Sequence, residues 1–347
     1  MSARRVATAA AVHASAPLRV DLAGGTLDLW PLGLLQPGGA TAAVAISLRV
    51  AASAGPPPRS GVIALAAEDL ALSEEHPANA PLRCRGRLEL LQRIAAALAP
   101  PEGVTLSTRA PVAQGSGLGT SSALGVAAVA ALLRYRGLRP ARDEVVALVR
   151  DLEAQVLGIP TGTQDHEAAW GGGAFFIRHA PGGGTLWLLP RPLLARLGER
   201  LVIFDSGRAR SSGPSNWDMF RRRIEGDAAA VRALAQVADA GARAAEALAA
   251  HDWRALGRAM RKDLDARRNW SPLVLTPTLE RAFDAARRAG ALGFKVCGAG
   301  GGGFAVALAE PSRRARVACA IGDTGARLCD AGPTARGLTV ERRRGAS

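Results

Sequence analysis

Apolar and polar positions divide the chain into a first part rich in strands and a second part rich in helices. Short runs of alternating or continuous apolar residues predict strands. In the first part they fall near residues 17–23, 41–51, 61–67, 103–109, 173–179 and 185–189. Apolar residues at helical spacing predict helices there near residues 87–99, 120–136 and 142–157.

After Asp205, helical spacing dominates. We expect helices near residues 212–224, 228–249, 252–268, 277–290 and 311–321. Strands are predicted near residues 292–297, 303–309 and 337–342. Strands followed by helices, with two late strands on either side of a glycine-rich loop, predict an α+β fold in two layers.

The length of 347 residues suits two packed domains. We expect the first to span residues 1–200 and the second residues 201–347. No apolar run reaches the roughly 18 residues that a membrane span needs. The first residues carry Arg4 and Arg5 but no leucine-rich stretch, so no export signal is predicted. Scattered cysteines predict neither zinc nor disulfides, which is typical of a cytoplasmic protein.

The net charge of +14 comes almost entirely from arginine and raises the question of nucleic-acid binding. The arginines form short clusters on predicted helices, such as Arg221–Arg223. The chain has one tyrosine and no interleaving of basic and aromatic residues that would stack bases. We therefore expect solvated helix faces and a contribution from an anionic ligand, with no nucleic-acid partner.

The most informative motif is a glycine loop, Gly115–Ser122, that leads into an apolar helix. Free N–H groups at a helix N-terminus attract anions, and glycine allows close approach to the backbone. The loop lacks the lysine of a Walker A motif, and Ser122 stands where a dinucleotide fingerprint has its third glycine. A phosphate site is predicted. The alternative is a flexible turn whose Ser or Thr caps the helix.

A second glycine run, Gly298–Gly303, lies between two short apolar segments. It fits Gly-x-Gly-x-x-Gly, but a strand follows where the dinucleotide motif needs a helix. We expect a strand–loop–strand unit with a ligand or another backbone packed against the loop.

Ionisable residues occur in and before the segment Gly158–Gly173. Glu153 lies on the predicted helix that precedes it, and Asp165 follows a Pro/Gly turn. Asp165 either serves a site or caps a short helix, and the residues alone leave both open.

Near the N-terminus, a strand ends in a glycine turn that carries Asp28. Alternation places Arg19, Asp21 and Ala23 on one face of this strand. An inward Arg19 needs a charged partner, and a carboxylate or a phosphate would serve. The alternative is an exposed edge strand with solvated charges.

These segments, in this order, resemble the GHMP kinases, the superfamily of galactokinase, homoserine kinase, mevalonate kinase and phosphomevalonate kinase. The resemblance rests on three family motifs and on the segment around Asp165, and it covers about residues 16 to 309. The matching segments are Ala16–Asp28, Pro111–Ala123, Gly158–Gly172 and Lys295–Gly303. It implies a fold with an N-terminal domain like domain 2 of ribosomal protein S5 and a ferredoxin-like C-terminal domain.

The resemblance also implies the members of the site. ATP would bind at the loop formed by Gly115, Ser116, Gly117, Leu118, Gly119, Thr120, Ser121 and Ser122. Ser122 and Glu153 would hold Mg²⁺. Asp165 would be the catalytic carboxylate with Arg19 beside it. The substrate would contact Gly25, Asp28, His166, Gly300 and Gly301.

The chain most closely resembles the bacterial sugar-kinase branch that includes D-glycero-D-manno-heptose 7-phosphate kinase. Thr26 and Leu27 replace the Gly-Thr of that branch, His166 replaces its second Gln, and Asp205–Ser212 is similar to another of its segments. This implies a sugar or sugar-phosphate acceptor and a protein that acts as a monomer or homodimer. Alternatives are a kinase for a hexose such as galactose or fucose, a kinase for a mevalonate-type alcohol, and a nucleotide-binding regulator without catalysis.

Overall fold

The structure, a computed structural model, describes residues 10–181, 184–207 and 213–342. An eight-stranded sheet forms the first layer, and its main path runs β12-β1-β2-β5-β3-β4. The strands of this path are β1 (Val12–Ala23), β2 (Ala40–Gly55), β3 (Val62–Ala67), β4 (Leu72–Pro77), β5 (Gly103–Arg109) and β12 (Thr339–Arg342). The long strand β2 also pairs with β6 (Ala174–Arg178), which pairs with β7 (Thr185–Leu188).

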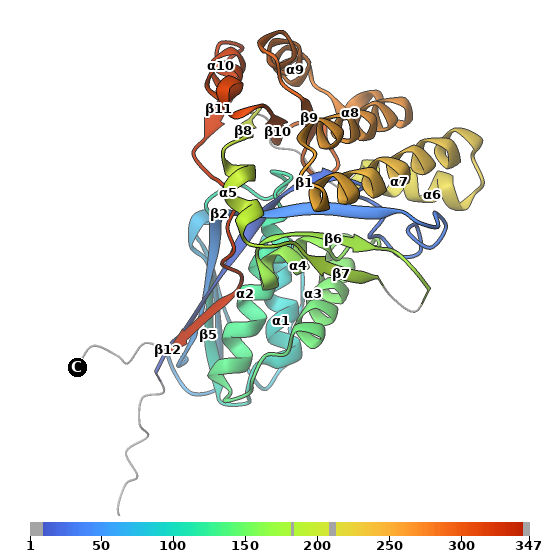
Figure 1. The fold of residues 1–347 in the computed structure, drawn as a ribbon. Helices are drawn as coiled ribbons and strands as arrows, with labels where there is room; N and C mark the ends of the chain where they lie inside the picture. The colour runs from blue at the N-terminus through green and yellow to red at the C-terminus, as the bar shows by residue number, and fades with distance from the viewer. Residues whose placement is uncertain (1–9, 182–183, 208–212, 343–347) are drawn as a thin grey trace, which may run out of the picture.

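Four helices pack together against this sheet (Figure 1). They are α1 (Glu89–Leu98), α2 (Thr120–Tyr135), α3 (Arg142–Leu157) and α4 (Gln164–Gly171). Helix α2 is apolar around most of its circumference and is buried against β1 and β2, with α1, α3 and α4 around it. Short 3₁₀ turns lie at Glu68–Leu70, Gly86–Leu88 and Pro272–Val274.

A four-stranded sheet with the order β11-β8-β10-β9 forms the second layer. Its strands are β8 (Leu201–Asp205), β9 (Gly293–Val296), β10 (Phe304–Leu308) and β11 (Arg327–Cys329). The helices around it are α5 (Pro192–Gly198), α6 (Gly213–Ile224), α7 (Ala228–Ala249), α8 (Trp253–Trp270), α9 (Pro277–Ala289) and α10 (Pro311–Gly322). Asp227, Asp252 and Thr276 cap α7, α8 and α9 through side-chain hydrogen bonds.

The two layers meet where α7 crosses β1 and β2 (Figure 1). A Cβ atom on either Gly24 or Gly241 would lie 1.8 Å from the carbonyl oxygen of Ala40, so this crossing requires glycine at both positions. The last strand, β12, returns to the first sheet and pairs with β1. The chain therefore passes from the first sheet to the second and back.

The predicted α+β fold and the strand–loop–strand unit β9–β10 are confirmed. Four elements, β4, α5, β8 and β11, were not predicted from the sequence. The division of the chain near residue 200 remains a prediction. In the part of the chain that the structure describes, no helix is long and apolar enough to cross a membrane.

Candidate active site

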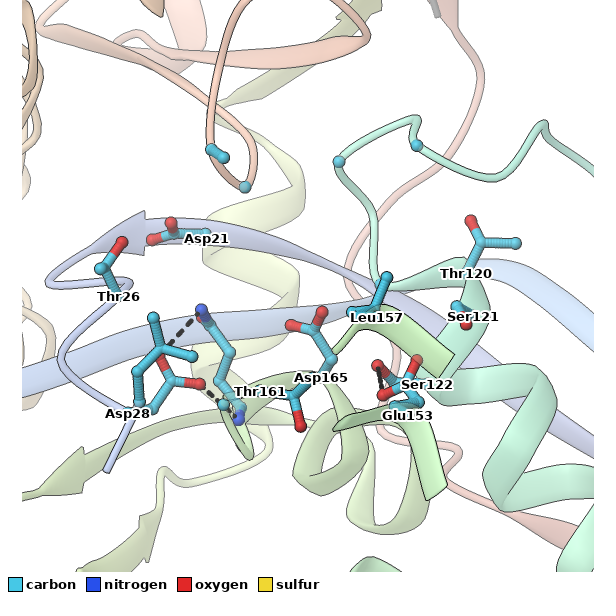
Figure 2. A pocket seen from close by; sticks show the side chains of 18 of the residues that line it. Asp21, Thr26, Asp28, Thr120, Ser121, Ser122, Glu153, Leu157, Thr161 and Asp165 are labelled. Atoms are coloured by element: carbon cyan, nitrogen blue, oxygen red, sulfur yellow. Dashed lines mark hydrogen bonds between the residues drawn. The ribbon is translucent and has the colours of Figure 1, made fainter. Parts of the chain in front are cut away.

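A pocket of about 390 Å³ lies where the ends of β1, α2, α3 and α4 meet the β9–β10 loop. Figure 2 shows Asp165 near its middle, with Asp28 and Thr26 on one side and Ser122 and Glu153 on the other. The pocket thus joins segments that lie far apart in the sequence.

The glycine loop forms one wall of this pocket. Gly115, Gly117 and Gly119 line it, and all three have positive φ angles, which favour glycine. Gly119 is the N-cap of α2, and no side chain caps this helix, so the alternative of a Ser or Thr cap is wrong. The first N–H groups of a helix have no partner within it. The wall therefore offers backbone donors and the positive end of a helix dipole to an anion.

The second glycine run packs against the first, backbone to backbone. A Cβ atom on Gly303 would lie 2.4 Å from the Ser116 carbonyl oxygen, and one on Gly117 would lie 2.5 Å from that of Cys297. The Phe304 N–H also donates to the Ser116 carbonyl, at 2.9 Å. The sequence predicted that a ligand or another backbone packs against the β9–β10 loop. In the structure, the backbone of the first glycine loop packs there.

Arg19 and Asp165 form an ion pair inside the pocket. The Arg19 Nε donates to the Asp165 Oδ1 at 2.6 Å, and the same guanidinium donates to the Gly117 carbonyl. Burial lowers the pKa of Arg19, but the charges of Asp165 and Asp21 and the hydrogen bond to Asp165 together outweigh it, and the pKa stays above its ordinary value. Asp165 follows the first residue of α4, whose N-cap is Thr163, so the interpretation of Asp165 as an N-cap is wrong. The inward Arg19 has the carboxylate partner that the strand pattern required.

Glu153 and Ser122 meet at the other end of the pocket. The Ser122 hydroxyl donates to the Glu153 Oε2 at 2.8 Å, and the His166 Nε2 lies 2.8 Å from the same oxygen. Burial opposes ionisation of Glu153, but His166 and the serine hydroxyls outweigh it and lower its pKa. His166 is buried behind Glu153 and does not line the pocket, and its pKa is raised mainly by Glu153 against the effect of burial.

Asp28 lies beside the N-terminus of α4. Its Oδ2 accepts a hydrogen bond of 3.0 Å from the Gln164 N–H. Gly162 leaves room for this carboxylate, because a Cβ atom there would lie 1.9 Å from Oδ2. Burial raises the pKa of Asp28, and the negative charge of Asp165 adds to the rise. The carboxyl is thus fixed in place with part of its surface toward the pocket.

Most of the predicted site residues line this pocket. They are Arg19, Asp28, Gly115, Gly117, Gly119, Thr120, Ser121, Ser122, Glu153 and Asp165. Six others do not, namely Gly25, Ser116, Leu118, His166, Gly300 and Gly301. The loop that was expected to contribute Gly300 and Gly301 lines the pocket with Gly298 and Ala299 instead, and the Gly301 N–H donates to the Val274 carbonyl at 2.7 Å. Of the segment Asp205–Ser212, which the sequence likens to one in the sugar-kinase branch, residues 208–212 lie outside the described residues.

A buried charge cluster next to the pocket was missed by sequence reasoning. Asp263 on α8 accepts hydrogen bonds of 2.6 Å from both Arg267 and Lys295, and its side chain is fully buried. The only signal in the sequence is the spacing of four residues between Asp263 and Arg267, which an exposed helical pair would share.

Two family models match the chain. Residues 85–173 match the GHMP kinases N terminal domain, and residues 244–327 match the GHMP kinases C terminal domain. The bifunctional fucokinase/GDP-fucose pyrophosphorylase of Arabidopsis thaliana is 28% identical over 219 residues, which are 62% of this chain and 21% of that protein. The D-glycero-alpha-D-manno-heptose 7-phosphate kinase of Campylobacter jejuni is 27% identical over 220 residues, which are 62% of this chain and 63% of that protein. The chain thus spans less than two thirds of the length of these curated relatives.

A solved structure, that of a D-glycero-D-manno-heptose 1-phosphate kinase from Bacteroides thetaiotaomicron, has the same fold. It superposes with a TM-score of 0.76 at 22% identity, over 96% of this chain and 100% of that one. The likeness covers nearly the whole of this chain and concerns its fold.

Proposed function

The chain belongs to the GHMP kinase superfamily, and we propose that it transfers the γ-phosphoryl group of ATP to a hydroxyl of a sugar or sugar phosphate. The observation that carries this proposal is the place of the Arg19–Asp165 pair. It lies between an uncapped helix N-terminus, which suits phosphates, and Asp28, which suits hydroxyl groups.

The glycine loop fits the phosphates of ATP. The first N–H groups of α2 have no intrahelical partners, and the loop glycines leave the backbone uncovered. Arg19 holds this loop to the catalytic pair, because it donates to the Gly117 carbonyl and its own N–H donates to the Leu118 carbonyl at 3.1 Å. The donor side and the reacting carboxylate are therefore positioned by the same residue.

The residues opposite the pair fit Mg²⁺. The described residues include no group of three or more His, Cys, Asp or Glu that could hold a metal by themselves. A nucleotide-bound Mg²⁺ needs only one or two carboxylates, since phosphate oxygens and water complete its shell. Glu153, ionised because its pKa is lowered, supplies that carboxylate, and Ser122 supplies a hydroxyl. Bound there, the ion would neutralise charge on the phosphates.

Asp165 interacts with the acceptor hydroxyl that is phosphorylated. It accepts the proton of that hydroxyl or orients the hydroxyl for attack. Arg19 holds its carboxylate in place and offsets negative charge on the transferring group. Because 24% of the Asp165 side chain is exposed, the carboxylate remains accessible to a substrate while paired.

The acceptor is a sugar or sugar phosphate of the heptose 7-phosphate type. Support comes from Asp28, which presents a fixed carboxylate to substrate hydroxyls, and from the similarity to the heptose kinase sequence. The chain is also similar to a fucokinase, so hexoses belong in the same trial.

A screen of ADP release tests the proposal. The purified protein is given ATP and Mg²⁺ with hexoses, heptoses, their phosphates and mevalonate, each in separate reactions. We expect release of ADP that needs one class of sugar and stops when the metal is chelated. Tight ATP binding without turnover on any alcohol would contradict the proposal and favour a regulator. ADP release that survives chelation would contradict the assignment of Ser122 and Glu153.

A further inference from the structure

Asp21 is a buried carboxylate in the pocket that the proposed function does not use. It lies on β1 two residues after Arg19, and only 1% of its surface is exposed. It nevertheless lines the pocket, on the side where Figure 2 shows Thr26 and Asp28. Within the described part of the chain, neither of its carboxylate oxygens has a hydrogen-bond partner.

Such a group costs free energy unless something compensates for it. A buried carboxylate without hydrogen bonds is strongly unfavourable, and each one in a folded protein calls for an explanation. The Lys295 Nζ lies 3.3 Å from the Asp21 Oδ2 and balances its charge. Lys295 makes its shorter contact, of 2.6 Å, with Asp263. Asp21 is thus neutralised in charge, but its oxygens remain free to accept.

The surrounding backbone leaves space for this carboxylate. A Cβ atom on Gly25 would lie 2.4 Å from the Asp21 Oδ2, so the glycine at this position keeps the carboxylate where it is. Asp263 takes the donors that could otherwise have reached Asp21, since Arg267 and the Gly24 N–H also donate to it, at 2.6 and 2.7 Å. Asp21 thus lines the pocket with a carboxylate to which no described protein group donates.

The charges of the pocket indicate which ligand group would meet Asp21. Three carboxylates, Asp21, Asp28 and Asp165, line this end. Among the described lining residues the one cation is Arg19, which is already engaged by Asp165 and the Gly117 carbonyl. Hydrogen-bond donors must then come from the ligand. A hydroxyl group fits because it can donate a hydrogen bond, whereas an ionised carboxylate or phosphate oxygen has no hydrogen to donate.

We propose that Asp21 accepts a hydrogen bond from a second hydroxyl of the acceptor, and that the part of the acceptor between Asp21 and Asp28 is an uncharged polyol. This inference rests on the proposed function and deepens it. Any phosphate of the acceptor lies away from Asp21. Asp21 and Asp28 are then specificity-determining residues, while Asp165 receives the hydroxyl that is phosphorylated.

The test compares Asp21→Asn with the parent protein on the best acceptor from the ADP-release screen. The Asn amide oxygen is a neutral and weaker acceptor than the carboxylate, so the acceptor KM should rise by roughly tenfold. The KM for ATP should stay within about threefold, because the phosphate loop is untouched. Asp239→Asn, the same change at an ion pair on α7 remote from the pocket, is the matched control and should alter neither constant. A normal acceptor KM in folded Asp21→Asn overturns the inference.

A series of monodeoxy acceptors tests the same point without any substitution. We expect two hydroxyls, besides the one phosphorylated, each to lower kcat/KM by at least about tenfold when removed. The effect of removing one of them should be clearly smaller in Asp21→Asn, and this identifies the hydroxyl that Asp21 binds. If only one such hydroxyl exists in the parent protein, the inference fails although the kinase activity stands. If no alcohol is phosphorylated at all, the proposed function fails, and this inference fails with it.

Discussion

Two ion pairs between aspartate and arginine lie within the same region of this protein, and they differ in what surrounds them. Arg19 and Asp165 meet at 2.5 Å, and 24% of the Asp165 side chain is exposed. Arg267 and Asp263 meet at 2.6 Å, and the Asp263 side chain is fully buried. One pair opens into a pocket, and the other is closed on all sides.

The neighbours explain the difference. Asp263 also accepts from Lys295 and from the Gly24 N–H, and Arg267 donates to the Gly25 carbonyl, so this cluster ties α8 and β9 to the turn after β1. These bonds lower the pKa of Asp263 although burial alone would raise it. Among the described residues, the side chain that pairs with Asp165 is Arg19, and the Asp165 side chain stays partly exposed in the pocket. The same two residue types thus form a buried structural pair in one place and, in the proposed function, a catalytic pair in the other.

The largest effect is expected from Asp165→Asn. The change keeps the shape of the side chain and removes its charge, so kcat should fall by about 10²- to 10⁴-fold. The KM values for ATP and acceptor should change far less, because the interaction acts mainly in the transition state. Steady-state kinetics measures both. Activity within about threefold of the parent protein would mean that Asp165 is structural.

A substitution in the buried pair Arg267–Asp263 should lower the stability of the fold. Arg267→Met leaves Asp263 buried with one cation fewer, and removing one partner of a buried pair costs about 3–5 kcal/mol of unfolding free energy. Denaturant unfolding checks this. The parallel measurement on Arg19→Met should show a much smaller loss, since the open Asp165 can be solvated. Equal losses in the two variants would erase the distinction between the pairs.

Substitutions of the proposed Mg²⁺ ligands, Glu153 and Ser122, should have a smaller effect. Glu153→Gln and Ser122→Ala should each raise the Mg²⁺ concentration for half-maximal activity by roughly 10- to 100-fold, because both remove an oxygen ligand or its partner. Titration of activity with Mg²⁺ at fixed ATP measures it. A steep fall in melting temperature with an unchanged Mg²⁺ requirement would show that these residues only support the fold.

The smallest effect in the series is expected from Asp28, which lies on the side of the pocket proposed to bind the acceptor. Asp28→Ala should raise the acceptor KM by about tenfold through loss of one hydrogen bond to a charged group. The KM for ATP should stay near the parent value. An equal rise in both constants would mean that Asp28 only shapes the turn after β1 and its contact with Gln164.

The sequence predicted the long periodic elements well and the short ones poorly. The spacing of apolar residues predicts a helix over residues 228–249, and α7 has these bounds. Strand β8 was missed because a five-residue apolar run does not show by periodicity which element it forms. Strand β4 was missed because its residues are mostly polar and exposed, as suits the edge of a sheet.

In the site, the order of the motifs predicted that Arg19 lies beside Asp165, and the two residues are in contact in the structure. The contact of His166 with Glu153 depends on how α4 packs on α3, which no local pattern shows. The free oxygens of Asp21 depend on where the Lys295 ammonium group goes, and that is decided by α8. Motifs therefore predict which residues gather, while packing decides which of them stay unpaired.

The measurement that tests the central claim most directly is a double-mutant cycle on kcat with Arg19→Met, Asp165→Asn and the double variant. If the open pair acts as one catalytic unit, the double variant should be no slower, within about threefold, than the slower single variant. Unfolding free energies, measured on the same samples, should show that all three are folded. A kcat that falls by the product of the two single losses would contradict the account, because the two residues would then act independently.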